Sequence, residues 1–240
     1  MGILDKIRPA PLAGMSVEVG DLVLQLQIPE TFLDQARAAA LRRWEQVEAY
    51  LMRNPWFKDA DGPLQIDMDA PPIINAMTEA SRMVNVRPFA TLAGALVEAV
   101  AGDLAVACRE AVAGCEGVTY IVGGAKVRTH LIDPSGGDGR GVAVKVRSET
   151  PYAVYSSAGR VRIIPVTGRA RSISVVGKDG ALTEAVGVAI GATMRKSSRV
   201  EGVLATARQI GGLRGGVVVT SRDIGVWGDI EIVTPASPGA

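Results

Sequence analysis

Histidine and cysteine are scarce in this chain, and their scarcity excludes several kinds of catalytic and metal site. The 240 residues include one histidine and two cysteines. Any imidazole-based triad or metal centre would therefore depend on His130, and the sequence has neither a Cys-x-x-Cys pair nor the Gly-x-x-x-x-Gly-Lys-Ser/Thr run of phosphate-binding loops. Cys108 and Cys115 lie in an Ala-rich stretch, where a spacing of seven predicts two reduced thiols on one helix face.

The chain also lacks an excess of one charge and a long apolar run. Lys and Arg number 26 and Asp and Glu number 25, so no strong field steers the protein towards nucleic acid or an anionic membrane. No stretch reaches the ~18 consecutive apolar residues of a membrane span, and residues 1–11 lack the apolar core of a signal peptide. We therefore expect a cytoplasmic protein with no nucleic-acid or membrane partner.

Aromatic residues are few, but aliphatic residues are plentiful. Aromatics make up 4% of the sequence, whereas hydrophobic residues of all kinds make up 48%. A chain of this length buries roughly 70% of its unfolded surface, which is enough for a core without disulfides. We expect a single domain over residues 1–240, with flexible tails at 1–15 and 235–240.

The first half of the sequence predicts a hairpin and three helices. Apolar residues alternate on both sides of Gly20-Asp21, which predicts two paired strands over 17–28. Residues 32–51 carry apolar side chains at steps of three and four, as an amphipathic helix does, and Pro55 ends it. Pro71-Pro72 predicts the start of a second helix, and an Ala- and Gly-rich third helix over 88–104 is expected at the centre of the core.

The second half predicts short strands joined by Gly-rich turns, with two helices among them. The expected strands are 118–122, 142–146, 161–164, 172–176, 217–220 and 230–233, and the expected helices are 181–194 and 200–209. Because the helices and strands are segregated along the chain, we predict an α+β fold with a mainly antiparallel sheet.

Four stretches of the chain carry a family likeness. They are Arg53-Asn54-Pro55-Trp56-Phe57, residues 70–77 beginning Ala-Pro-Pro-Ile-Ile, residues 86–98 (Val-Arg-Pro-Phe-Ala-Thr-Leu-Ala-Gly-Ala-Leu-Val-Glu) and residues 227–232 (Trp-Gly-Asp-Ile-Glu-Ile). Together they resemble an uncharacterised family of ApbE-like proteins, distant relatives of the ApbE-type FAD:protein FMN transferases. The likeness covers residues 17–233 and implies a T-fold-related α+β domain with mixed helices.

The chain departs from that family where the resemblance would place a ligand. The family's Glu-Asn-Gly-Gly-Asp element matches residues 121–125, so Gly123 and Gly124 are kept while the flanking acids are not. Such a glycine pair permits positive φ or a close approach of ligand to backbone. A tight turn after a strand is the alternative interpretation.

The resemblance also implies that a magnesium site is lost. In the transferases an Ala-Asp-Ala-x-Ala-Thr-Ala run supplies oxygen ligands to Mg²⁺, and residues 183–189 match it. Glu184 could replace the Asp, but Val188 has no hydroxyl to replace the Thr. Because Mg²⁺ demands near-octahedral oxygen coordination, we expect no bound metal, while a flavin-like ligand stays possible.

Serines and arginines occupy two further family positions. A Thr-Ser-Ser-Gly element matches residues 155–158, which include Ser156 and Ser157, and Arg171 stands where the family has an acid. Two arginine pairs are spaced by two, so each would project to one face of a strand. They are Arg160 with Arg162, and Arg169 with Arg171. The pairs could hold an anion near the glycine pair in place of the metal, or they could line a solvated strand face.

Residues 129–136 (Thr-His-Leu-Ile-Asp-Pro-Ser-Gly) resemble the His-Ile-Ile-Asp-Pro-x-Thr-Gly motif of the transferases. They contain His130 and Asp133, which makes both weak candidates for a site. The run directly follows the glycine pair, however, whereas a longer segment intervenes in the transferases. Residues 133–139 also have the composition of a hairpin connection, which is the favoured interpretation.

Three functions remain open from the sequence. The first is a binding protein for an anionic, heteroaromatic small molecule of flavin, pterin or nucleotide type, without metal-dependent flavin transfer. The second is a divergent transferase that uses arginines in place of magnesium. The third is a non-catalytic structural subunit of a homo-oligomer or of a complex with a partner protein. The sequence does not decide whether the protein is an enzyme.

Overall fold

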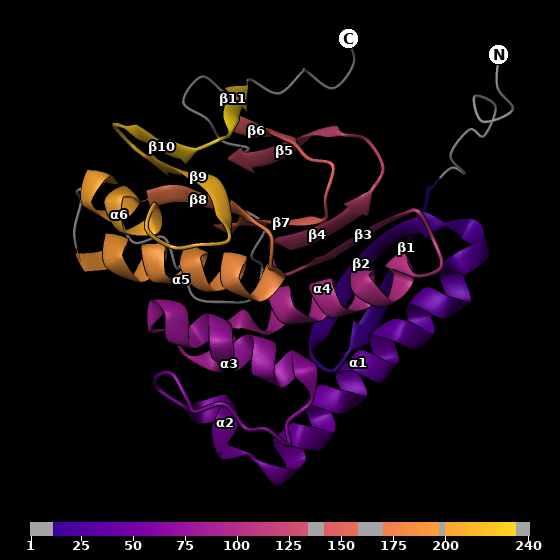
Figure 1. Ribbon diagram of the computed structural model, residues 1–240. Helices are drawn as coiled ribbons and strands as arrows, with labels where there is room; N and C mark the ends of the chain where they lie inside the picture. Colours follow the sequence, from indigo (N-terminus) through magenta and orange to yellow (C-terminus); the bar gives the residue numbers. More distant parts are fainter. Residues whose placement is uncertain (1–11, 134–141, 158–169, 197–199, 234–240) are drawn as a thin grey trace, which may run out of the picture.

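Three layers make up the protein: a small sheet, a large sheet and a set of helices, stacked in that order (Figure 1). The computed structural model describes residues 12–133, 142–157, 170–196 and 200–233, and the statements below concern those residues. Each strand pairing described is antiparallel, which is what the predicted α+β fold requires.

The chain opens with the predicted hairpin, formed by β1 (Leu12–Val19) and β2 (Leu22–Pro29). Gly20 turns the chain with a φ of 55°, and a β-carbon there would overlap the ring of Trp44. Residues 12–15 were expected to belong to a tail, but they pair with residues 26–29. The predicted boundary at residue 15 is therefore wrong, because the alternation of exposed and buried residues begins earlier than Val17.

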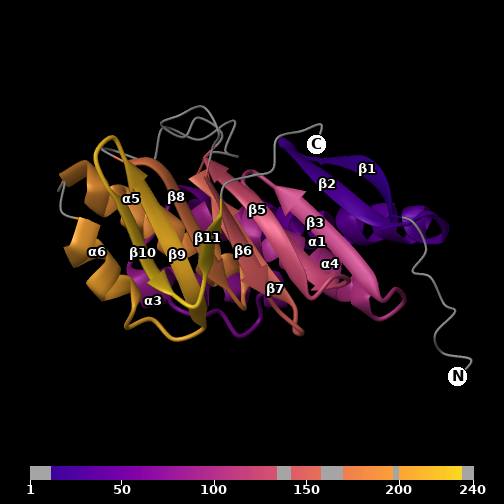
Figure 2. The ribbon, with the colours of Figure 1, turned by 90° about the horizontal axis from the view of Figure 1, so that it is seen from above.

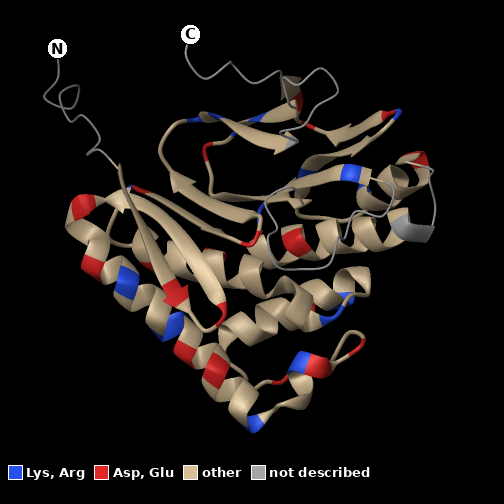
Figure 3. Cartoon of the chain, turned by 180° about the vertical axis from the view of Figure 1, so that it is seen from behind, with Lys and Arg blue, Asp and Glu red and all other residues tan. Residues whose placement is uncertain are grey.

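Helices from the first half of the chain cover one face of the large sheet. They are α1 (Leu33–Arg53), the short α2 (Trp56–Asp59), α3 (Pro72–Val84) and α4 (Leu92–Ala105), with 3-10 turns at Glu30–Phe32 and Pro88–Thr91. Asn85, in the left-handed conformation, ends α3. Figure 3 shows acidic and basic residues intermixed along α1, as the balanced composition predicts.

The large sheet runs in the order β1-β2-β3-β4-β7-β8-β9-β10. Its later strands are β3 (Glu110–Cys115), β4 (Val118–Gly123), β7 (Tyr152–Ser156), β8 (Ala170–Gly177), β9 (Leu213–Thr220) and β10 (Ile224–Gly228). Between β8 and β9 the chain forms α5 (Gly180–Lys196) and α6 (Val200–Ala207). These helices lie on the same face as α3 and α4 (Figure 1).

The small sheet covers part of the opposite face of the large sheet (Figure 2). Its strands, in the order β11-β6-β5, are β5 (Val127–Asp133), β6 (Val142–Arg147) and β11 (Glu231–Val233). β5 and β6 are antiparallel neighbours, as the hairpin interpretation of residues 133–139 predicts. The expected strand at 161–164 lies outside the described residues.

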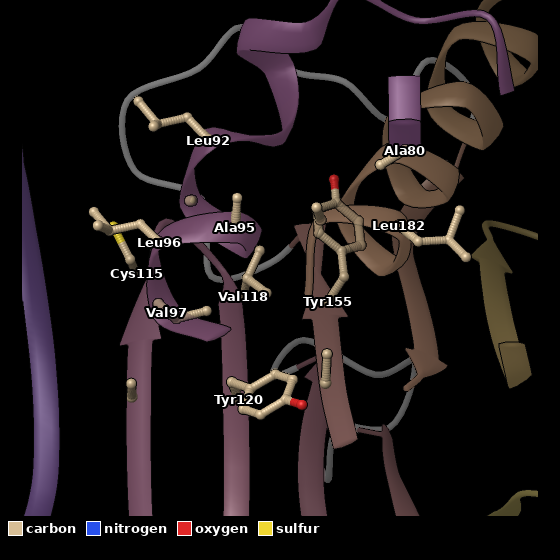
Figure 4. Packing of buried hydrophobic residues seen from close by; sticks show 14 of the residues in the cluster. Ala80, Leu92, Ala95, Leu96, Val97, Cys115, Val118, Tyr120, Tyr155 and Leu182 are labelled. Carbon is tan, nitrogen blue, oxygen red and sulfur yellow. The ribbon is translucent and has the colours of Figure 1, made fainter. Parts of the chain in front are cut away.

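Two apolar cores separate the layers. The larger lies between the large sheet and the helices, where Tyr155 of β7 packs close to α4 and α5 (Figure 4). The smaller lies between the two sheets, around Ile132 of β5 and Val144 of β6. The stretch Pro88–Ala105 is long and apolar enough to cross a membrane, but 61% of it is buried in the protein, where it forms a 3-10 turn and the core helix α4.

The helical placement of the two cysteines is wrong. Cys108 follows α4, and Cys115 is the last residue of β3. The run Glu-Ala-Val-Ala-Gly-Cys over 110–115 buries every second residue, and this period of two outweighs the helix preference of alanine. Both side chains are buried thiols outside any disulfide in the described part of the chain, as expected.

Candidate functional site

The glycine pair forms the turn that carries the chain from the large sheet to the small sheet. Gly123 and Gly124 have φ values of 64° and 76°, which favour glycine. A β-carbon on Gly123 would overlap the carbonyl oxygen of Arg109. One on Gly124 would overlap the side chains of Glu110 and Arg128. The turn therefore needs both glycines for its own packing.

Glu110 and Arg128 form an ion pair directly beneath this turn. Arg128 Nη2 donates to Glu110 Oε1, and the two side chains are only 22% and 18% exposed. The Nε–H of Arg128 is buried and, among the residues that the structure describes, meets no hydrogen-bond acceptor. A buried donor without a partner is costly, so the ion pair is held in place at the expense of this N–H.

A cavity of about 390 Å³ lies beside the ion pair, between the two sheets. It is bounded by β2, β3 and β4 of the large sheet and by β5 of the small sheet. Its lining residues are Gln27, Val112, Thr119, Ile121, Arg128, Thr129 and His130. The volume lies within the range of small-molecule pockets.

His130 is held in the wall of this cavity by a neighbour on β7. Its Nε2 lies 2.9 Å from the Tyr152 hydroxyl oxygen, and the two rings meet edge to face with their centres 5.8 Å apart. Burial, with a further contribution from the charge of Arg128, lowers the pKa of His130 to about 4. Burial raises the pKa of Tyr152. The imidazole is therefore neutral at neutral pH.

The serine and arginine positions lie at the other end of the strands. Strands β4 and β7 are antiparallel, with Val118 opposite Tyr155 and Ile121 opposite Tyr152. Ser156 therefore lies just beyond the start of β4. Gly123 lies at the opposite end of that strand. The structure therefore does not bring Arg171, which is exposed at the start of β8, next to the glycine pair. Arg160, Arg162 and Arg169 lie outside the described residues.

Ser156 and Ser157, the two candidate serines, both form hydrogen bonds at this end of the strands, away from the glycine pair. Ser156 Oγ donates to the carbonyl oxygen of Ile132 at 3.3 Å, and Ser172 Oγ donates to the same oxygen. Ser157 Oγ accepts from the backbone N–H of Ile173 at 2.9 Å. Asp133 ends β5 one residue beyond Ile132, and its backbone is opposite Val142.

Two glutamates join α4 and α5 reciprocally, and we call this arrangement the Glu98–Glu184 clamp. The N–H of Gly94 in α4 donates to Glu184 Oε2 of α5 at 2.7 Å, and the N–H of Gly180 in α5 donates to Glu98 Oε2 of α4 at 2.7 Å. Glu184 is only 1% exposed. The backbones of Gly94 and Gly180 touch, so neither position has room for a side chain.

The clamp also perturbs nearby ionisations. Burial, with a further contribution from the charge of Asp179, raises the pKa of Glu98 to about 7, although the hydrogen bond from Gly180 opposes the change. Burial, together with the charges of Glu98 and Asp179, raises the pKa of Tyr120. Glu98 and Asp179 thus place negative charge beside Tyr120 of β4.

The residues at the start of α5 do not fit a magnesium site of the kind that the transferases have at the matching run. The carboxylate of Glu184 accepts a backbone N–H, and position 188 is valine. Within the described ranges no group of three or more His, Cys, Asp or Glu side chains could hold a metal ion. Mg²⁺ requires a shell of oxygen ligands, whereas Glu184 has an N–H donor as its neighbour here.

A family model described as AbpE bacteria matches residues 11–219. The chain belongs to this family. Among similar curated proteins are UPF0280 proteins of two archaea. That of Methanocaldococcus jannaschii is 24% identical over 216 residues, covering 83% of each chain. That of Methanosarcina acetivorans is 22% identical over 207 residues, covering 85% of this chain and 81% of the other.

Solved structures extend the family's likeness to flavin transferases. The apo form of the flavinyl transferase ApbE from Pseudomonas stutzeri has a TM-score of 0.59 at 9% identity, covering 92% of this chain and 95% of that one. The ApbE protein of Thermotoga maritima has a TM-score of 0.57 at 12% identity, covering 92% and 96%. These matches confirm the predicted divergent ApbE-like α+β fold.

Sequence reasoning singled out His130 of the cavity and Glu184 of the clamp, but it missed the residues that they meet. Glu110, Arg128 and Tyr152 belong to no motif, and they meet only through strand pairing. Glu98 had a signal, because it is a carboxylate within the apolar run 92–104 of the central helix. Burying a carboxylate in an apolar helix is costly unless it is hydrogen-bonded, so the position predicts a buried donor nearby.

Proposed function

We propose that this AbpE bacteria family member binds an anionic, heteroaromatic small molecule and does not perform metal-dependent flavin transfer. The proposal that the protein lacks metal-dependent flavin transfer depends on the hydrogen bond from the Gly94 N–H to the Glu184 carboxylate. The one acid of the matched run serves as an acceptor for a helix end, and its neighbour at position 188 supplies no oxygen. The flavin-transferase-related fold supports a ligand of flavin, pterin or nucleotide type.

Two features support binding over a purely structural role. The cavity between the sheets is large enough for a ring system, and its lining combines the apolar Val112 and Ile121 with the polar Gln27 and Thr119. The arginine-based transferase has less support, since Arg171 lies at the far end of the strands from the glycine pair.

Two measurements test the proposal. Incubation with FAD, Mg²⁺ and an acceptor peptide is expected to give no flavinylated peptide, with or without EDTA. Native mass spectrometry of freshly purified protein is expected to show a retained small molecule. Metal-stimulated flavinylation would overturn the proposal, and so would ligand-free protein that also fails to bind flavins, pterins and nucleotides when they are added.

We further propose that the chain acts as one cytoplasmic domain and that copies associate through sheet edges. β1 lies at one edge of the large sheet and β10 at the other, and an edge strand presents unpaired backbone groups. Light scattering coupled to size exclusion is expected to give a mass above 25.0 kDa. A monomer at all concentrations would refute association.

A further inference from the structure

The small sheet ends at β5, which has no partner strand on its outer edge among the described residues. The N–H of Ser148 donates to the carbonyl oxygen of Lys126 at 2.8 Å, so residue 126 directs its backbone groups towards β6. Because this direction alternates along a strand, the backbone groups of Arg128 and His130 also face β6. The N–H and C=O groups that face the open edge are those of Val127, Thr129 and Leu131.

The cavity between the sheets opens along this edge. Arg128 points inward to Glu110, and His130 points inward to Tyr152. The side chain of Thr129, between them, therefore points to the outer face of the small sheet. All three residues of β5 nevertheless line the cavity, because it runs past the backbone edge of the strand. The cavity is thus a groove beside an unpaired strand. Its floor belongs to the large sheet: Gln27, Val112, Thr119 and Ile121.

The large sheet extends beyond β5, and its extension is uncovered. Figure 2 shows β1 and β2 lying past β5. On β2, Leu24 and Leu26 face the helices and are buried. Val23, Gln25 and Gln27 face the other way and are exposed. A further strand beside β5 would therefore lie above β2 and β3, where the described residues leave room for it.

This extension decides what kind of partner fits the edge. A second copy that paired its own β5 here would be related by a two-fold axis perpendicular to the small sheet. Both large sheets would then lie on the same side, and the β1–β2 hairpin of each copy would collide with that of the other. A single extended segment needs only the width of one strand, about 4.8 Å.

We propose that β5 binds an extended segment of a partner protein, which adds to the small sheet as an antiparallel strand. Its backbone hydrogen bonds are made to the N–H and C=O groups of Val127, Thr129 and Leu131. The inference goes beyond the proposed function, because it concerns a protein partner and does not depend on a small molecule.

The charges at the groove decide which segment fits. Side chains of the segment that lie beside Arg128 and His130 point into the groove. Glu110 already pairs with Arg128, and His130 is neutral at neutral pH, so a charged side chain there would lose its water without gaining a partner. The outer face is open to water, since Val127 and Leu131 are 36% and 53% exposed. The segment therefore alternates apolar residues facing inward with polar or charged residues facing outward.

Amide exchange measured by NMR tests the site, with the acetylated and amidated peptide Lys-Val-Glu-Val-Lys-Val-Glu as the partner. In the free protein the amides of Thr129 and Leu131 are expected to exchange at least tenfold faster than those of Arg128 and His130, which are bonded to β6. Peptide at about millimolar concentration is expected to slow exchange at Thr129 and Leu131 at least tenfold. The amides of β1 and β10, the edge strands of the large sheet, serve as the internal control and are expected to stay unchanged.

Methylated peptides test the backbone pairing itself. In an antiparallel pair, the residues whose N–H groups face β5 have their side chains on the outer face, so they are the Lys and Glu residues of the peptide. N-methylation of the central Glu and Lys is expected to weaken binding at least tenfold. N-methylation of the first two Val residues, whose N–H groups face away from β5, is expected to change binding by less than threefold.

Thr129→Pro removes one N–H from the open edge without removing a bond to β6, and an edge strand tolerates proline. It is expected to weaken peptide binding at least tenfold, whereas the matched control Thr129→Val, which keeps the N–H, is expected to stay within twofold of wild type. Urea unfolding distinguishes lost binding from lost folding. Should Thr129→Pro not fold, the methylated peptides and the exchange rates of the wild type decide alone.

Three results would overturn the inference. They are unchanged exchange at Thr129 and Leu131 in the presence of the peptide, slowing in β1 or β10 instead of β5, and equal weakening by the two methylated peptides. The outcomes are separate from those of the proposed function. Protein that binds the peptide but no flavin, pterin or nucleotide would keep this inference and remove the proposed function, whereas a retained small molecule in protein that does not bind the peptide would do the reverse.

Discussion

Glu184 shows how a single buried acid can serve as a structural residue. Its carboxylate accepts the N–H of Gly94 near the start of α4, where helix N–H groups lack partners inside their own helix. The bond joins residues 90 positions apart and holds α4 against α5. The same carboxylate was a candidate ligand-binding group from the sequence, and its burial at 1% exposure leaves it little access to a ligand.

Replacing Glu184 should therefore destabilise the fold. Glu184→Ala leaves the Gly94 N–H unpaired and opens a void, with an expected loss of about 3 kcal/mol in the free energy of unfolding. Glu184→Gln keeps an acceptor oxygen and should lose less than half of that. Urea unfolding in the presence and absence of Mg²⁺ measures both. If Mg²⁺ stabilised the wild type but not Glu184→Gln, Glu184 would be a metal ligand after all.

Glu98 provides a prediction about pH. Its pKa is raised from 4.5 to about 7 in the folded chain, so between those values the folded state binds more protons than the unfolded state. Stability from this group is complete below about pH 4.5 and is lost as the pH rises through 7, by roughly 3 kcal/mol at most. Glu98→Gln removes the titration, so its stability relative to wild type should rise across this range.

The free energy of unfolding should be compared between Glu98→Gln and wild type at each pH, because the titration of His130 changes the stability of both proteins in the opposite direction. Its pKa is lowered to about 4, so its contribution is complete above 6.5 and is lost as the pH falls through 4. Urea unfolding at intervals from pH 4.5 to 8 gives the difference for Glu98→Gln. A difference that did not change with pH would show that Glu98 titrates normally.

At the scale of elements, the crossing of α4 and α5 depends on two glycines in contact. A β-carbon on Gly94 would overlap the carbonyl oxygen of Gly180, and both atoms belong to backbones that cannot move independently. The close approach is also what allows each glutamate of the clamp to reach the other helix. The Ala- and Gly-rich composition of 88–104 predicted close packing, but it did not identify the partner helix.

Gly94→Ala should consequently cost at least 3 kcal/mol in unfolding free energy, even though alanine favours helices. Gly102 lies in the same helix with nothing within 4 Å of its β-carbon position, so Gly102→Ala is the matched control. It should stabilise the protein by about 1 kcal/mol through helix propensity alone. Equal effects of the two substitutions on thermal unfolding would mean that the helix crossing is looser than described.

The sequence predicted the long helices well and the strands only in part. α1 appears where steps of three and four predicted it, and α3, α4 and α5 lie in the other stretches that were expected to be helical. β3, β5, β7 and β10 were missed: β3 is Ala- and Gly-rich, β5 mixes polar and apolar residues, and the other two span five residues each. The candidate site was less predictable, because the cavity arises from β5 crossing to a second sheet, and no local pattern encodes that pairing.

At the scale of the whole molecule, the two cores differ in how they are anchored. The large sheet is covered by helices that also contact one another. The small sheet packs against the large sheet through the smaller core. β11 pairs with β6 over three residues, and Lys145 Nζ lies 3.1 Å from Glu231 Oε2 at that pairing. Ile230, just before β11, packs against the smaller core.

A chain that ends at Asp229 should therefore lose order in the small sheet while keeping the large one. It lacks Ile230 and β11, so β6 becomes an edge strand and the smaller core loses part of its cover. Hydrogen exchange should show lost protection in 127–133 and 142–147, with 213–220 and 92–105 still protected, because β9 stays paired with β8 and β10 in the large sheet and α4 belongs to the larger core. A uniform loss of protection would mean that both cores unfold as one unit. In that case the cavity between the sheets could not be loosened independently of the rest of the protein.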